Sequence, residues 1–330
     1  MSNIFTTKTI SAFFGAIVLL ICIVGFWWSF EPSTFNVNER ANAVAETNNQ
    51  QVVPGYTTTH TLIEVVDTML NKSGGYLTND ITPPGVLLDN IPSWEFGVLE
   101  MSRDLALAMR KDFSRAQSQS VSNQPLAKAQ PNLNFDNSRW ILPSSEGQYK
   151  DALKALKEYR DNLGNREITD NQFYTRADNL REYLKQVEKR LGSLSQRLSA
   201  SVGTDVINTN LAGDTNASNS APESRVLVNK TGWFELDNVF YEARGSSWAL
   251  LHFLKAIETD FANVLNKKNA TVSLQQIIRE LEGTQESVFS PVILNGSGFG
   301  LLANHSLVMA NYISRANAAL IELSELLNQG

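Results

Sequence analysis

The strongest periodic signal in the chain is the stretch 173–198, with the sequence FYTRADNLREYLKQVEKRLGSLSQRL. Its apolar residues recur alternately four and three positions apart, which is the heptad spacing of a helix that buries one narrow stripe. The stripe consists of Phe173, Ala177, Leu180, Leu184, Val187, Leu191, Leu194 and Leu198. Thr169 and Gln172 have the spacing of a capping box at its start. This stretch predicts a long helix and makes an all-α fold the expectation.

The segment before this stretch, 145–163, is also amphipathic. Its apolar face consists of Tyr149, Leu153, Leu156 and Leu163. A short turn at 164–168 would join the two helices, so the sequence predicts a long antiparallel coiled-coil hairpin over 145–200. Charges of both signs are mixed along it, which is typical of a solvated outer face. The hairpin is the predicted surface for self-association or for an envelope protein partner.

The rest of the chain shows helical segments separated by polar loops. Periodicity, with glycine and proline as breakers, predicts helices at 58–73, 93–115, 234–266, 272–282 and 301–327. Loops are predicted at 76–91, 116–138 and 284–300. The Asn- and Ser-rich stretch 201–224 is typical of a flexible insertion. Only 226–228 and 292–294 are candidates for short strands.

An uncharged apolar segment covers 10–30, with the sequence ISAFFGAIVLLICIVGFWWSF. At about 1.5 Å per residue a helix of this length crosses the hydrocarbon layer of roughly 30 Å. Trp27, Trp28 and Phe30 would form an aromatic belt at one end, and Lys8 lies at the other. The sequence therefore predicts one transmembrane helix that contacts the lipid bilayer.

The positive-inside rule gives this helix a direction, because Lys8 and the amino terminus precede it. We expect residues 1–9 to be a cytoplasmic tail, 31–56 to be a stalk, and 57–328 to form a periplasmic helical domain. The prediction is a single-pass protein of the bacterial inner membrane.

Two alternatives for this segment stay open. Ala41-Asn42-Ala43 has the form of a signal-peptide cleavage site, although the apolar run is long and the site lies far beyond its end. Cys22 follows Leu19, Leu20 and Ile21, as in a lipoprotein signal, although Ile21 is bulky where a small residue is expected. Cys22 is the only cysteine, so the predicted exported body can form neither a disulfide nor a thiolate metal site.

Four stretches resemble a known family. They are LLDNIPSWEFGVL at 87–99, FYTRADNL at 173–180, FYEARGSSWALLHFLKAI at 240–257 and NGSGFGLLANHSLVMANYISRANAAL at 295–320. They are similar to an uncharacterised proteobacterial family that is defined only as a domain of unknown function, and the resemblance covers about residues 55–328. It implies a bacterial membrane-anchored protein and implies no activity.

The most suggestive local motif is NGSGFG at 295–300, which precedes a predicted helix. Gly296, Gly298 and Gly300 are similar to a dinucleotide-binding turn, in which glycines let a phosphate approach a helix N-terminus. Leu301 stands where a third glycine or alanine belongs, and no βαβ unit surrounds the motif. The pattern favours a tight turn that needs positive φ or close packing, with an anion or carbonyl site as the alternative.

Polar residues near this motif complete the candidate ligand site. Asn295, Asn304 and His305 flank the glycines, and Glu242 and Arg244 lie on the 234–266 helix. A histidine here could bind a ligand, although a buried histidine bonded to a loop carbonyl is the simpler interpretation. With three histidines and one cysteine in the chain, no metal site and no cofactor are predicted.

The sequence leaves two functional hypotheses. The first is a non-enzymatic interaction or scaffold protein of the cell envelope. The alternative is an envelope enzyme or small-ligand-binding protein with a pocket near 295–306 and 240–252. No catalytic residue is assigned, because Glu286-Ser287 is only faintly similar to the lytic transglycosylase pair and no G-x-S-x-G occurs. The net charge of −6 gives no electrostatic reason to bind nucleic acid.

Overall fold

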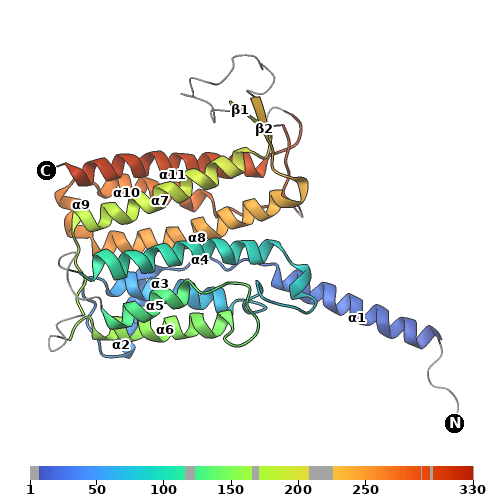
Figure 1. Ribbon diagram of the computed structural model, residues 1–330, viewed down its shortest axis with the longest axis horizontal. Helices are drawn as coiled ribbons and strands as arrows, with labels where there is room; N and C mark the ends of the chain where they lie inside the picture. Colours follow the sequence, from blue (N-terminus) through green and yellow to red (C-terminus); the bar gives the residue numbers. More distant parts are fainter. Residues whose placement is uncertain are drawn as a thin grey trace, which may run out of the picture.

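The computed structural model describes residues 7–115, 123–165, 171–207, 226–290, 292–297 and 300–329. A bundle of antiparallel helices forms the body, and one helix projects from an end of it (Figure 1). The helices are α1 (Thr7–Trp28), α2 (Val37–Thr47), α3 (Tyr56–Asn71), α4 (Asn90–Ala108), α5 (Gln124–Leu133), α6 (Ser145–Asn162), α7 (Ala177–Ser199), α8 (Leu236–Asp260), α9 (Ala262–Lys267), α10 (Thr271–Gly283) and α11 (His305–Asn328). The prediction of an all-α fold is confirmed for the body.

A small β-hairpin is the only sheet among the described residues. Strand β1 (Thr204–Ile207) pairs antiparallel with β2 (Val226–Asn229). The predicted strand at 226–228 is therefore present, and its partner lies at the start of the predicted insertion. The other candidate, 292–294, forms no strand, and an isolated bridge between Asn295 and Asn304 follows it.

Helices α4 and α8 pack side by side in the middle of the bundle (Figure 1). Their backbones approach closely at two glycines. A Cβ on Gly97 would lie 2.1 Å from the carbonyl oxygen of Glu242, and one on Gly245 would lie 2.1 Å from that of Trp94. Side chains larger than hydrogen at these positions would push the helices apart. The central pair is flanked by α3, α5 and α6 on one side and by α7, α10 and α11 on the other.

The predicted hairpin over 145–200 requires a correction. The buried stripe on α7 is confirmed, since Leu184, Val187 and Leu191 are fully buried. However, α7 packs against α11, whereas α6 packs against α5 and α3 (Figure 1). A heptad stripe shows that one face is covered but carries little information about which helix covers it. Thr169, at the expected cap, lies outside the described residues.

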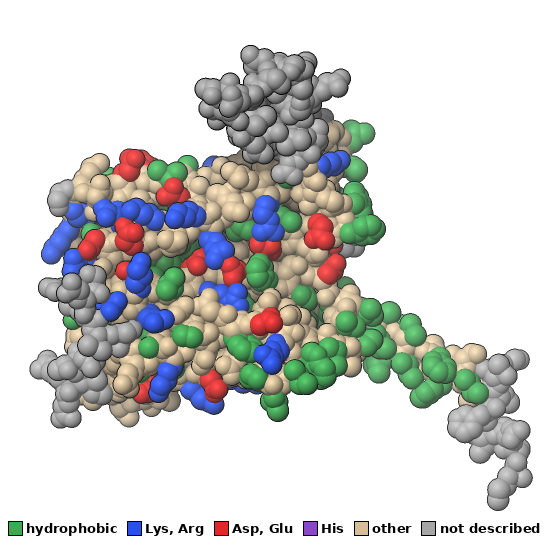
Figure 2. Space-filling model, viewed as in Figure 1, with side chains coloured by type: hydrophobic (Ala, Val, Ile, Leu, Met, Phe, Trp, Pro, Cys, Tyr) green, Lys and Arg blue, Asp and Glu red, His purple; other side chains and the backbone are tan. Residues whose placement is uncertain are grey.

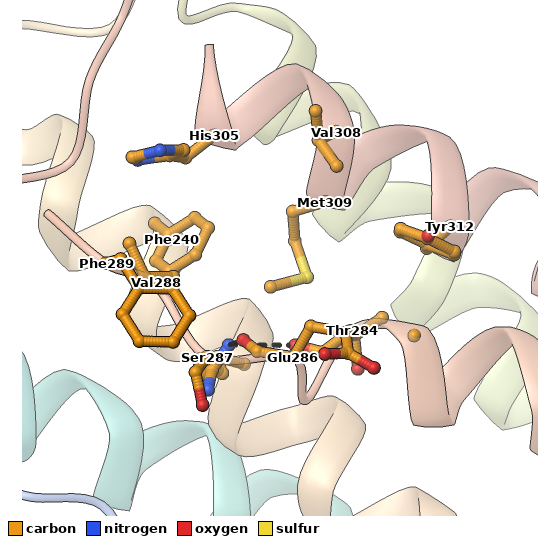
Figure 3. A pocket seen from close by; sticks show the side chains of 12 residues that line it. Phe240, Thr284, Glu286, Ser287, Val288, Phe289, His305, Val308, Met309 and Tyr312 are labelled. Carbon is orange, nitrogen blue, oxygen red and sulfur yellow. Dashed lines mark hydrogen bonds between the residues drawn. The ribbon is translucent and has the colours of Figure 1, made fainter. Parts of the chain in front are cut away.

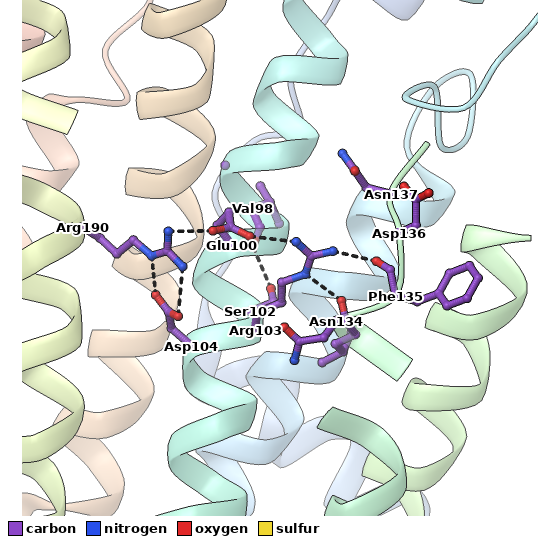
Figure 4. A network of polar contacts seen from close by, with 12 residues as sticks. Val98, Glu100, Ser102, Arg103, Asp104, Asn134, Phe135, Asp136, Asn137 and Arg190 are labelled. Atoms are coloured by element: carbon purple, nitrogen blue, oxygen red, sulfur yellow. Dashed lines mark hydrogen bonds and ion pairs between the residues drawn. The ribbon is translucent and has the colours of Figure 1, made fainter. Parts of the chain in front are cut away.

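A polar network fixes α7 against α4 (Figure 4). Arg190 of α7 binds Asp104 at 2.8 Å and Glu100 at 2.7 Å, both on α4. On the opposite flank of α4, Arg103 donates to the carbonyl oxygens of Leu133, the last residue of α5, and of Phe135, at 2.8 and 2.7 Å. Charged residues of α4 thus connect the two halves of the bundle.

The predicted stalk at 31–56 also differs from the structure, because this segment lies along the body. The Phe35 ring stacks on His252 of α8 at 4.0 Å, and its N–H donates to His252 Nε2 at 3.0 Å. Helix α2 then buries Val37, Ala41 and Ala45. Alanines spaced four residues apart give a weak hydrophobic signal, although they allow close helix packing.

Because successive helices are antiparallel, the connections alternate between two ends of the body. The α1 end, named for the helix that leaves it, carries the described parts of 72–89, 134–144, 200–235 and 284–304. The far end carries those of 48–55, 109–123, 163–176 and 261–270. Hydrogen bonds connect neighbouring loops of the α1 end, for example Tyr76 Oη to the Asn137 carbonyl at 2.9 Å and Asn295 Nδ2 to the Ser201 carbonyl at 2.9 Å.

Candidate functional site

The glycine motif lies in a closed loop before α11. Two backbone hydrogen bonds close it, from Gly296 N–H to Ala303 at 2.9 Å and from His305 N–H to Leu294 at 3.0 Å. The Asn304 amide donates to Asn295 Oδ1 and to the Gly296 carbonyl, both at 2.7 Å, and its oxygen caps α11 by accepting from Leu307 N–H at 2.8 Å. Asn304 therefore uses its side chain to close the loop and to cap α11, and Asn295 uses its side chain in the loop and on the Ser201 carbonyl.

The glycines serve close packing in this loop. A Cβ on Gly296 would lie 2.1 Å from the carbonyl oxygen of Leu302, so a larger residue would break the closed arrangement. Neither Gly296 nor Gly300 has a positive φ, so packing rather than backbone freedom requires glycine at 296. Gly298 lies outside the described residues.

Arg244 acts as a clamp on the α1 end. Its guanidinium donates to the carbonyl oxygens of Thr284 at 3.0 Å, Glu286 at 2.8 Å and Gln285 at 3.3 Å. Its Nε also binds the Glu31 carboxylate, whose pKa is raised by burial despite this partner. These bonds hold both the turn after α10 and the segment before α2 against α8.

Glu242 does not join the other predicted site residues. It pairs with Arg197 of α7, with Nη1 2.6 Å from the carboxylate. The two residues lie about half a helical turn apart, so their side chains point to different neighbours: Arg244 faces the turn after α10, and Glu242 faces α7. The sequence placed both residues on one helix, but only the packing of α8 shows that they face different neighbours.

A cavity of about 230 Å³ lies beside His305, between α8, α11 and the turn after α10 (Figure 3). Its walls are mainly apolar and include Phe240, Val288, Phe289, Val308 and Met309. His305 lies at one side in Figure 3, and Glu286 and Ser287 lie at the other. The apolar walls with a few polar groups are typical of small-molecule sites, although the volume lies below the roughly 300–1,000 Å³ of most such sites.

The hydrogen bonding of His305 defines what its ring can offer a ligand. Nδ1 accepts from the Leu294 N–H at 3.1 Å, so the neutral ring carries its proton on Nε2. Burial lowers the pKa of His305, which favours the neutral ring at pH 7. The ring therefore presents one N–H donor beside Phe240, whose ring centroid is 6.4 Å away.

The most deeply buried ion pair among the described residues was not predicted from the sequence. Lys72 and Glu95 pair with side-chain exposures of 2% and 0%, and Glu95 also accepts the N–H groups of Leu77 and Thr78 at 2.8 Å each. The pair fixes the loop that follows α3. The burial of Glu95 could have been predicted from the sequence, because α4 is apolar around most of its circumference and leaves Glu95 no exposed face.

The architecture is that of a helical body joined to a helix that could cross a membrane. Among the described residues, this helix, Thr9–Trp28, is the one long and apolar enough to do so. The family model described as an uncharacterized protein conserved in bacteria (DUF2333) matches residues 2–330. The chain belongs to this family, as the resemblance in its sequence indicated. No curated protein and no solved structure matches it. Among the described residues, no cluster of three or more His, Cys, Asp or Glu side chains could hold a metal.

Proposed function

We propose that this protein is anchored in the bacterial inner membrane by α1, has its body in the periplasm, and binds a small amphipathic molecule in the cavity beside His305. The composition of α1 supports the anchor, because its apolar side chains, such as Phe13 and Leu19, are exposed rather than packed on the body. Exposed apolar helices of this length are stable in lipid and not in water.

The cavity is the observation that supports ligand binding. An open cavity beside His305 favours a ligand-binding protein, whereas a scaffold protein is expected to have a filled core at this position. The scaffold hypothesis was based on the heptad stripe of the 173–198 helix, on the polar linkers and on the lack of a catalytic motif. That stripe is buried against α11 within the body, so it offers no free surface to a partner protein.

The cavity's chemistry limits the ligand. Phe240, Val308 and Met309 favour an apolar group, and His305 Nε2–H favours a hydrogen-bond acceptor. The lining also includes the Glu286 carboxylate, and the guanidinium of Arg244 there is already bound to Glu31 and to three carbonyl oxygens, so neither group favours an anion. We therefore infer a small neutral molecule, or one end of a larger one, that combines an apolar body with an acceptor such as a carbonyl.

Methionine methyl NMR tests this proposal on the full chain in nanodiscs. Met309 lines the cavity, whereas Met69, Met101 and Met109 are buried in the core and serve as internal references. Titration with phenylacetamide, an aromatic ring with a neutral carbonyl, is expected to shift the Met309 methyl signal saturably and to leave the references unchanged.

Two variants sharpen the titration. His305→Leu removes the N–H donor, and Val308→Phe narrows the cavity from an exposed position; both are expected to weaken the saturable shift, while Val272→Phe at the far end is not. A Met309 signal that responds no more than the references would overturn the ligand proposal.

The orientation of the chain in the membrane is tested separately. Alkaline phosphatase fused after Gly330 is expected to be active in intact cells, and the mature chain is expected to keep residues 10–30. An inactive fusion would place the body in the cytoplasm, and an amino terminus near Ala43 would show a cleaved signal peptide.

A further inference from the structure

The α1 end of the body exposes large apolar side chains in each of its described loops. Leu87 follows α3, Leu142 precedes α6, Phe234 precedes α8, and Phe289 and Leu301 lie between α10 and α11; Leu142 is 87% exposed and Phe289 99%. Figure 2 shows apolar side chains gathered on this end, around the point where α1 leaves. Concentrations of exposed apolar groups mark surfaces that contact a protein or a membrane.

Contacts between α1 and a loop of the body indicate how far this end of the body reaches along the apolar span. A Cβ on Gly25 would lie 3.3 Å from Pro84 Cβ and 3.9 Å from a methyl group of Leu88. Gly25 lies five residues before the end of the apolar span 10–30, which is about 7 Å along a helix. The loop that carries Leu87 therefore reaches the level of the outer part of the apolar span.

Three loops of this end contain stretches without charge, although Asp80, Asp89, Asp136, Arg139 and Glu286 lie in the same loops. No Asp, Glu, Lys or Arg occurs in 81–88 (ITPPGVLL), in 140–145 (WILPSS) or in 287–304. Charged groups are expelled from the hydrocarbon boundary, whereas aromatic side chains concentrate there. Trp140 and Trp233 are both exposed at this end.

The described residues of the far end show no such concentration of exposed apolar side chains. Its exposed large apolar side chains, such as Val52 and Val272, are isolated, which is normal for a soluble surface. Its connections also carry charges, for example at Arg110 and Lys111 and at Lys267 and Lys268. The two ends therefore differ in what they can contact.

We propose that the α1 end of the body is a lipid-docking surface that inserts its apolar loops into the leaflet from which α1 emerges. The occupant is the bilayer that α1 crosses, because the loops beside Gly25 already lie at its depth. This inference rests on the proposed membrane insertion of α1. Docking would hold the bundle upright on the membrane and place the cavity beside His305 next to the lipid.

The test uses the full chain with Cys22→Ser, reconstituted into phosphatidylcholine–phosphatidylglycerol vesicles. Single cysteines carry the fluorophore NBD at Leu142→Cys and Leu301→Cys on the α1 end, at Val272→Cys on the far end, and at Val18→Cys in α1. All four native side chains are exposed, so substitution leaves the core intact. Lipids with a nitroxide on the acyl chain then quench probes that lie in the bilayer.

Docking predicts blue-shifted emission and loss of most of the signal at 142 and 301, with little change at 272. Probes at 142 and 301 that behave like the one at 272 overturn the docking surface. The probe at 18 reports α1 separately: quenching there with none at 142 and 301 means an anchored chain without docking, whereas no quenching at 18 means that the proposed anchor fails.

Discussion

The two ends of the bundle use the same kinds of residue in opposite ways. At the far end Phe113, Phe173 and Phe261 meet with ring centroids 5.2–5.7 Å apart, and Phe113 and Phe261 are fully buried. At the α1 end Phe234 and Phe289 are almost fully exposed. Hydrophobicity alone therefore does not place an aromatic residue in the core; a neighbouring segment must also cover it.

The ends differ in their buried ionisable groups as well. The α1 end holds ion pairs, Lys72 with Glu95 and Arg244 with Glu31. At the far end, burial raises the pKa of Asp260 to about 6, although the carboxylate accepts the Thr58 N–H and hydroxyl at 2.7 Å. Two ion pairs thus hold loops at the α1 end, whereas at the far end the buried Asp260 carboxylate is held by the N–H and hydroxyl groups of Thr58.

Breaking the ion pair of the α1 end is expected to have the largest effect. Glu95→Ala leaves the buried Lys72 ammonium without a charged partner and should lower the free energy of unfolding by about 3–5 kcal/mol. Chemical denaturation followed by circular dichroism measures it. Asp151→Ala, which breaks the exposed pair with Lys154, is the control and should change stability by less than about 1 kcal/mol. Equal losses of stability in the two variants would mean that the buried ion pair contributes no more than the exposed one.

Removing one ring from the aromatic cluster of the far end is expected to have the next-largest effect on stability. Phe261→Ala removes a fully buried ring and is expected to lower the free energy of unfolding by about 3–5 kcal/mol, toward the lower value if neighbours collapse into the space. The same denaturation measures it. A loss below about 0.5 kcal/mol, the range of surface substitutions, would show that this cluster does not close the far end.

Acid should act on the far end through His60. Burial, followed by the positive charges of Arg160 and Arg40, lowers the pKa of His60 to about 4. The folded chain then binds fewer protons than the unfolded chain, whose histidine has a pKa near about 6.5. Stability from His60 is complete above about pH 6.5 and is lost as pH falls toward about 4, by up to about 3 kcal/mol.

His60→Gln should therefore reduce the loss of stability between neutral pH and pH 4, measured by denaturation across that range. Asp260 acts in the opposite sense, because its raised pKa adds stability at low pH that is lost as pH rises toward about 6. His305→Gln, at a partly exposed ring, is the matched comparison with a smaller effect. Identical pH profiles for wild type and His60→Gln would contradict the assignment.

Phe289→Ala, the counterpart of Phe261→Ala at the α1 end, should have the smallest effect on stability. Its ring is 99% exposed, so the expected change in the free energy of unfolding is within about 0.5 kcal/mol. A loss comparable to that of Phe261→Ala would mean that Phe289 packs on the body, and the contrast between the ends would disappear.

Sequence patterns located most helices well. The predictions 58–73 and 272–282 correspond to α3 at Tyr56–Asn71 and α10 at Thr271–Gly283, because leucine, isoleucine and valine mark their buried faces. Helices α2 and α5 were missed within a predicted stalk and a predicted loop. The buried face of α2 is largely alanine, which contributes little to a hydrophobic pattern, and α5 is a short helix with only two buried leucines.

For the candidate site, the sequence indicated the segments that surround the cavity but not what the individual residues do there. It grouped His305, Arg244 and Glu242, of which only His305 and Arg244 line the cavity, with Arg244 serving as a clamp. Glu95 and Asp260 did not stand out, since a charged residue in an apolar helix shows its partner only when distant segments come together.

The sequence by itself determined that the chain is helical, that one segment is long and apolar enough to cross a membrane, and that the 173–198 helix buries a stripe. These properties follow from local periodicity and length, which act within one helix. Tertiary structure alone decided that α7 packs on α11 rather than α6, and which apolar loops are left uncovered at the α1 end. Both depend on shape and charge complementarity between segments far apart in the chain, which no local pattern contains.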